Sequence, residues 1–225
     1  GPVDATGAGI SPQKLLVNFL DNHDVPRFLF TGAGNYPEDP IFGTPLPIET
    51  RRSMLHNALL YLMTWDGIPC IYYGTEQDFE GGNDPGNRED MWIAQRHEPF
   101  FKNAPTYARV KLLAKVRREH PALARGELNI LWASDRTNDS DEDANVFAFE
   151  RSDAATGDYA IVVINANLNG SKSPSFGGQA MQVGAAPGMV LVDALGAVTD
   201  SITVSSDGRV SITLPPSSGA ILVPQ

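Results

Sequence analysis

The pattern of hydrophobic and polar positions divides the chain into two parts with different hydrophobic periodicity. In the first part, residues 15–20 and 68–73 are almost continuously apolar, which is typical of strands buried on both faces of a parallel sheet. Residues 50–65 and 106–119 carry apolar side chains at intervals of three and four, which predicts two helices, the first of them capped by Thr50. This alternation of strand and helix predicts parallel strands joined by crossover helices.

From about residue 126 onward, short alternating runs replace the helical pattern. Turn residues separate these runs at the spacing of an antiparallel sandwich: "NVFAFER", "YAIVVINA", "MVLVDAL", "SITVSS", "RVSITL" and "AILVPQ". We therefore predict a domain boundary near Arg125 to Glu127. An α/β domain is expected over residues 1–126 and a β-sandwich domain over residues 127–225.

Composition and charge then narrow the classes of function. The 225 residues are 42% hydrophobic and 20% charged, which is ordinary for a globular protein. The formal net charge of -10 argues against a nucleic acid partner, because phosphate binding needs clustered Lys and Arg. No apolar run reaches the ~18 residues of a membrane helix. The single cysteine, Cys70, stands in the apolar run "GIPCIYYG" and is expected to be a buried small hydrophobe.

Four polar residues follow the first predicted strand directly: Asp21, Asn22, His23 and Asp24. In parallel α/β folds the catalytic groups lie at the C-terminal ends of strands, so an active site is expected at this point of the chain. Asp and Asn also form turns and cap strands, and position alone does not separate the two interpretations.

Four segments resemble conserved segments of the α-amylase superfamily of glycoside hydrolases and transglycosidases, and they occur in the order of that family. They are "FLDNHD" at 19–24, "GIPCIYYGTEQ" at 67–77, "GGNDPGNRE" at 81–89 and "VRREHPALARGEL" at 116–128. The resemblance implies the C-terminal part of a (β/α)8 TIM barrel, from its seventh strand onward, followed by an antiparallel β-sandwich domain.

The resemblance also implies roles for individual residues. Asp24 matches the third acidic residue of the family's catalytic trio, which hydrogen-bonds sugar hydroxyls at the cleavage subsite and favours an oxocarbenium-like ring. His23 matches the neighbouring sugar-binding histidine. Asp84 and Arg88 match loop positions that contact a more distant glucose in cyclodextrin-forming glucanotransferases, whereas Glu76 is expected to be structural. The side-chain chemistry is consistent with these roles, because an ionised Asp accepts hydrogen bonds strongly and a His can donate them.

The implied activity is cleavage of α-glucosidic bonds in starch-like glucans by a retaining mechanism, with a cyclodextrin-forming glucanotransferase as the alternative. Such a mechanism needs a nucleophilic carboxylate and a carboxylic acid about 5–5.5 Å apart. The resemblance assigns both to segments before Gly1, so we expect a C-terminal fragment that is inactive alone. The implied partner is an α-glucan oligosaccharide or polysaccharide, and the implied location is extracellular. No cofactor is expected in the fragment, although calcium remains possible in the full-length enzyme.

Two alternatives from other classes remain open. Asn-His-Asp also occurs in dinuclear-metal phosphoesterases, but such a site needs several further His and Asp ligands. Only His56, His97 and His120 remain, so no metal ligand is assigned. A non-catalytic carbohydrate-binding relative is the other alternative, and the presence or absence of the two earlier carboxylates decides it.

The acidic run "DSDEDANVFAFE" nearly matches a calcium-binding loop. Five residues fall at loop positions 1, 3, 5, 7 and 12: Asp139, Asp141, Asp143, Asn145 and Glu150. Position 6, where the sharp turn needs Gly, is Ala144. Residues 146–149 also alternate like a strand, so a solvated hairpin loop is the preferred prediction.

Overall fold

The fold is described from a computed structural model that covers residues 11–31, 46–92 and 101–225. The chain forms two compact units, Gly1–Leu112 and Leu113–Gln225. The predicted domain boundary at residues 126/127 marks a change of secondary structure rather than of packing, and it stays a prediction. Within the described ranges, no helix is both long enough and apolar enough to cross a membrane.

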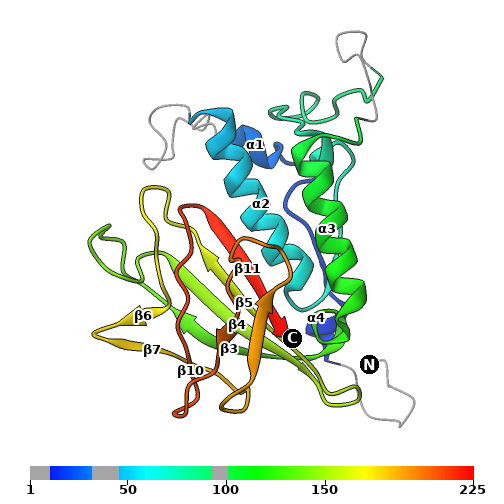
Figure 1. The fold of residues 1–225 in the computed structure, drawn as a ribbon. Coiled ribbons are helices and arrows are strands. Elements are labelled where there is room, and N and C mark those ends of the chain that lie inside the picture. Colours follow the sequence, from blue (N-terminus) through cyan, green and yellow to red (C-terminus); the bar gives the residue numbers. More distant parts are fainter. Residues whose placement is uncertain (1–10, 32–45, 93–100) are drawn as a thin grey trace. The chain divides into compact units, whose positions relative to one another are not determined.

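The first unit contains a pair of parallel strands. The short 3-10 helix η1 (Pro12–Leu15) leads into β1 (Val17–Asn18), which pairs in parallel with β2 (Ile68–Pro69). Between them the chain passes through α1 (Phe28–Thr31) and the long α2 (Ile48–Thr64), and α1 packs against α2 (Figure 1). The predicted parallel arrangement is therefore confirmed, but regular pairing covers only two residues of each strand.

The helix α2 begins two residues earlier than predicted. Pro47 precedes its first turn and no side chain caps it, so Thr50 lies inside the helix and the predicted cap is wrong. The chain then turns at Gly67, whose φ is +100°. A Cβ atom there would lie 2.6 Å from the carbonyl oxygen of Leu16, so the close approach of this turn to β1 requires glycine.

The two strands of the first unit are not buried on both faces, in contrast to the prediction. Leu16, Val17 and Ile68 are 58%, 56% and 49% exposed, and Cys70 is also exposed rather than buried. The reason is geometric, because two strands cannot cover each other's faces and each needs neighbours above, below and beside it.

The second unit is built from antiparallel strands after two helices. The helix α3 (Pro105–Glu119) spans the division between the units, and α4 (Pro121–Arg125) follows it with Pro121 in its first turn. Nine strands follow: β3 (Glu127–Ala133), β4 (Val146–Asp153), β5 (Asp158–Asn165), β6 (Ser175–Phe176), β7 (Gln179–Gln182), β8 (Val190–Asp193), β9 (Ile202–Thr203), β10 (Arg209–Val210) and β11 (Ser218–Pro224).

These strands form two sheets (Figure 1), and side chains of both sheets contribute to one hydrophobic core. The larger sheet has the order β3-β4-β5-β11-β8-β9, and the smaller has the order β10-β7-β6. Ile161 and Leu222 of the larger sheet and Met181 of the smaller sheet belong to the same buried cluster, each with 0% exposure. An α/β region followed by an antiparallel β-sandwich is therefore confirmed.

Candidate functional site

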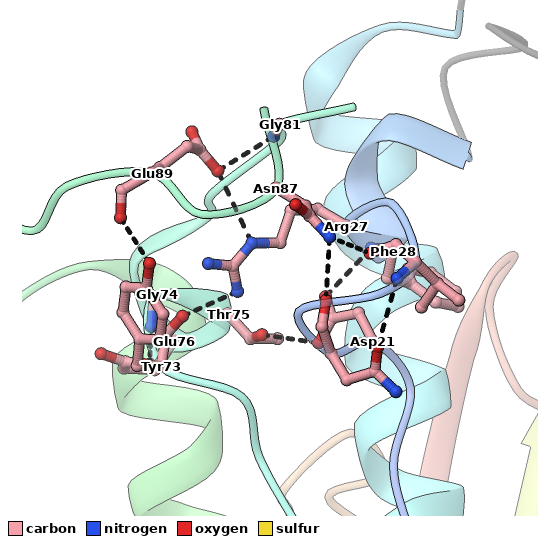
Figure 2. A network of polar contacts seen from close by, with 12 residues as sticks. Asp21, Arg27, Phe28, Tyr73, Gly74, Thr75, Glu76, Gly81, Asn87 and Glu89 are labelled. Atoms are coloured by element: carbon pink, nitrogen blue, oxygen red, sulfur yellow. Dashed lines mark hydrogen bonds and ion pairs between the residues drawn. The ribbon is translucent and has the colours of Figure 1, made fainter. Parts of the chain in front are cut away.

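The buried carboxylate Asp21 organises the turn that follows β1. It is 2% exposed. Its Oδ2 accepts a hydrogen bond from the backbone N–H of Phe28 at 3.0 Å, and its Oδ1 accepts one from Thr75 Oγ1 at 2.9 Å. Figure 2 shows Asp21 between these two partners. Asp21 therefore joins the end of β1 to the start of α1 and to η2 (Thr75–Gln77), and both of its oxygens are occupied.

The next three residues form a tight turn that presents two side chains to solvent. The Oδ1 atom of Asn22 accepts hydrogen bonds from the backbone N–H groups of Asp24 and Val25, at 2.7 and 3.2 Å. Such an Asx turn reverses the chain locally. The His23 and Asp24 side chains are 66% and 68% exposed, with His23 Nε2 3.4 Å from Asp24 Oδ2.

The loop over residues 81–89 contacts this turn through Arg88. The Nε atom of Arg88 donates to the carbonyl oxygen of His23 at 3.3 Å, and its Nη1 atom lies 3.1 Å from Asp84 Oδ1. Arg88 thus links Asp84 to the turn that bears Asp24. The structure therefore brings the four predicted site residues into one neighbourhood.

The same loop also holds the turn through the buried side chain of Asn87. Asn87 is 0% exposed, and its Nδ2 donates to the carbonyl oxygens of Asn22 at 3.2 Å and Val25 at 2.9 Å. This residue was not predicted from the sequence. Its one signal was its place in "GGNDPGNRE", beside the predicted Arg88.

A buried arginine supports the turn from the side of β2. The guanidinium of Arg27 is fully buried and lies 4.0 Å from the ring centre of Tyr72, while its Nη1 donates to the Tyr73 carbonyl oxygen at 2.7 Å. Its Nε lies 3.6 Å from Glu89 Oε2, which also accepts from the Gly81 N–H at 2.9 Å (Figure 2). The aromatic face and the carboxylate offset the cost of burying this charge.

Glu76 has the structural role expected for it. Its Oε2 accepts a hydrogen bond from the backbone N–H of Gly74 at 2.9 Å, within the turn that leads into η2 (Figure 2).

A second polar network joins α2 to η2 and to the start of α3. His56 Nε2 lies 3.0 Å from Thr106 Oγ1, Thr106 donates to Asp78, and Asp78 accepts from Arg52 Nε at 2.7 Å. Burial and then the positive charge of Arg109 lower the pKa of His56 to about 4, so the ring is neutral at pH 7.

The phosphoesterase alternative requires a cluster of metal ligands. Among residues 11–31, 46–92 and 101–225, no group of three or more His, Cys, Asp or Glu side chains could hold a metal ion. His97 lies outside those ranges.

Comparison with known proteins places the chain in a family. Residues 137–225 match the family model described as the α-amylase C-terminal all-beta domain. A cyclomaltodextrin glucanotransferase of Geobacillus stearothermophilus is 32% identical over 197 residues, which cover 87% of this chain and 22% of that protein. The chain belongs to the α-amylase family. An α-amylase of Niallia circulans is also 32% identical, over 195 residues that cover 87% of this chain and 30% of that protein.

The likeness extends to solved structures of the family. The crystal structure of a γ-CGTase from alkalophilic Bacillus clarkii superimposes with a TM-score of 0.66 and 31% identity, covering 92% of this chain and 26% of that one. The family resemblance predicted from four short segments is thus confirmed. The chain spans less than a third of the length of these relatives, with the shares of 22%, 30% and 26% given above.

Proposed function

We propose that this chain is the C-terminal region of an α-amylase-type enzyme that cleaves α-glucosidic bonds in starch-like glucans with retention. The proposal rests on a contrast within one turn, between exposed side chains and a backbone that is held in place. Asp24 and His23 project into solvent beyond the end of β1, while the backbone that bears them is held by the buried Asn87 and by Arg88. A firmly held backbone with solvent-exposed polar side chains is suited to binding a ligand rather than to stabilising a core.

In this proposal Asp24 binds the hydroxyl groups of the sugar at the cleavage subsite. Its carboxylate is exposed and free to accept hydrogen bonds, and bonds that strengthen as the ring distorts lower the barrier of the reaction. His23, 3.4 Å away, can donate to the same sugar. The nucleophile and the general acid are contributed by other segments, so we expect the 225 residues alone not to turn over soluble starch, which a direct assay of the pure chain checks.

Replacement of Asp24 in the complete enzyme tests the proposal. We expect Asp24→Asn to lower kcat by at least about 100-fold, because the neutral amide accepts more weakly from developing charge in the transition state. The melting temperature should stay unchanged, since the side chain is exposed. Asp21→Asn is the matched comparison, and it should lower the melting temperature because both oxygens of Asp21 are bonded to the protein. An unchanged kcat/KM in Asp24→Asn would refute the role of Asp24.

The glucanotransferase is the second candidate, favoured by the arrangement of the loop over residues 81–89. Asp84 and Arg88 are exposed and paired at 3.1 Å, and Arg88 also contacts the His23 carbonyl. These two residues can therefore hold a sugar unit some distance from the one that contacts Asp24.

The product distribution distinguishes the two candidates. Asp84→Ala in the complete enzyme should change the lengths of the oligosaccharide products more than the total rate of bond cleavage, as measured by chromatography of maltooligosaccharide digests. Cyclic products from the unmodified enzyme would favour the transferase. An unchanged product profile in Asp84→Ala would count against the contact with a distant glucose.

A further inference from the structure

The backbone of the turn that bears His23 and Asp24 is held from outside at three carbonyl groups. Asn87 Nδ2 donates to the carbonyl oxygens of Asn22 and Val25, at 3.2 and 2.9 Å, and Arg88 Nε donates to that of His23 at 3.3 Å. All three donors belong to the loop over residues 81–89, which is more than 60 residues away in sequence. None of these bonds uses the side chain of His23 or Asp24.

We propose that Asn87 is a positioning residue for Asp24, an inference that rests on the function proposed above. Its amide spans the two carbonyl groups on either side of His23 and Asp24, so both ends of the short segment are fixed by one group. Asn87 is 0% exposed and therefore holds one place in the loop, whereas Arg88 is exposed and also pairs with Asp84. The buried amide is thus the firmer of the two attachments.

The chemistry of the amide explains why asparagine is suited to this position. Both partners are carbonyl oxygens, which only accept, so the NH2 group of Asn87 must face them. Two donors are used on one nitrogen, and Oδ1 has no hydrogen-bond partner among the described residues. Loss of the NH2 group would remove two of the three hydrogen bonds described above and leave the one from Arg88 to the carbonyl oxygen of His23.

We expect the loss of the Asn87 side chain to affect the catalytic rate more than the formation of the turn. Asn22 still closes the turn through its own side chain, so the turn should form without Asn87. Its placement relative to the rest of the site would be less well defined. A displacement of about 1 Å in a group that contacts substrate can cost about 100-fold in rate.

Kinetics of the complete enzyme on a maltooligosaccharide test the proposal. Asn87→Ala removes both donors, and Asn87→Asp keeps the shape of the side chain but turns acceptor oxygens toward two carbonyl groups. Asn83→Ala is the matched control, because Asn83 is an exposed asparagine of the same loop whose backbone carbonyl, rather than its side chain, accepts from Gly86 N–H. We expect kcat to fall roughly 10- to 100-fold in both Asn87 variants, with KM changed by less than about threefold, and no change in the control.

A double-mutant cycle with Asp24 separates positioning from a general loss of stability. If Asn87 acts through Asp24, Asn87→Ala should have almost no further effect on the residual kcat of the Asp24→Asn enzyme, because coupled residues are not additive. Multiplied losses, or a lower melting temperature with an unchanged kcat, would overturn the proposal. Asn87→Ser, which keeps one donor in a smaller side chain, carries the same cycle if Asn87→Ala does not fold.

Two experimental outcomes distinguish the absence of a positioning role for Asn87 from the absence of the proposed enzyme activity. An active enzyme in which Asp24→Asn lowers kcat and Asn87→Ala does not would overturn the positioning role alone. A complete protein without turnover of α-glucans would overturn the proposed function and this inference with it.

Discussion

At the scale of residues, Asp21 and Asp24 stand three positions apart in almost the same sequence context. Asp21 is 2% exposed and both of its oxygens accept hydrogen bonds from the protein, whereas the Asp24 side chain is 68% exposed. The first environment stabilises a turn and the second can receive a ligand. What separates them is a contact with Thr75, 54 residues away, and pattern analysis of the local sequence contains no information about it.

The neutral His56 predicts how the stability of the first unit depends on pH. Burial, followed by the charge of Arg109, lowers its pKa to about 4, whereas a histidine in the unfolded chain titrates near 6.5. Between these values the unfolded state binds more protons. The free energy of unfolding should therefore be highest above pH 6.5 and should fall as the pH drops toward 4, by at most about 3 kcal/mol from this group.

Urea denaturation at a series of pH values measures this dependence. His56→Gln should flatten the change in the free energy of unfolding between pH 6.5 and 4. His23→Gln removes an exposed histidine of the same unit and tests whether histidine content alone sets the slope. Equal flattening in both variants, or none in His56→Gln, would contradict the assignment.

At the scale of elements, helices could be predicted from the sequence more closely than strands. The predicted helix over 106–119 corresponds to α3 (Pro105–Glu119), and the one over 50–65 corresponds to α2 (Ile48–Thr64). Helix periodicity is local, because residues three and four apart share a face whatever surrounds the helix. The start of α2 was missed because Pro47, not a capping side chain, precedes it.

The formation of a strand depends on pairing with other strands, and the local sequence does not identify those partners. The apolar runs over 15–20 and 68–73 pair over only two residues each in β1 and β2. The edge strand β3 (Glu127–Ala133) was not predicted, because all seven of its positions are partly or fully exposed and it lacks a clean alternation. By contrast, β4 and β5 lie inside the sheet and alternate or run apolar as predicted.

The acidic segment between β3 and β4 resembles a calcium-binding loop in sequence, but cationic side chains of the protein itself interact with it. Asp143 is 0% exposed, so the prediction of a solvated hairpin loop is wrong at this residue. Burial opposes its ionisation, but hydrogen bonds from Arg136 and Trp132 outweigh that effect and hold the pKa of Asp143 below its usual value. The Lys172 ammonium donates to the carbonyl oxygens of Asp139 and Asp141. Positive charge within the protein therefore occupies part of what resembled a calcium loop.

At the scale of the whole molecule, the two units differ in how completely their apolar surfaces are covered. In the second unit, two sheets share a core whose central residues are 0% exposed. In the first unit, Leu16, Val17 and Ile68 are 58%, 56% and 49% exposed on strands that pair over two residues. Short strands with free edges and few buried contacts open at low free-energy cost.

Limited proteolysis of the 225-residue chain should therefore cut within residues 11–92 first and leave a resistant product that contains residues 127–225. Mass spectrometry of samples taken over time identifies the products. In the complete enzyme, the segments proposed to carry the other two carboxylates would cover β1 and β2, so the same bonds should become resistant. Equal resistance of both units in the 225-residue chain would show that the first unit is stable without those segments. It would also remove the physical reason for interpreting its exposed strands as an interface with the rest of a barrel.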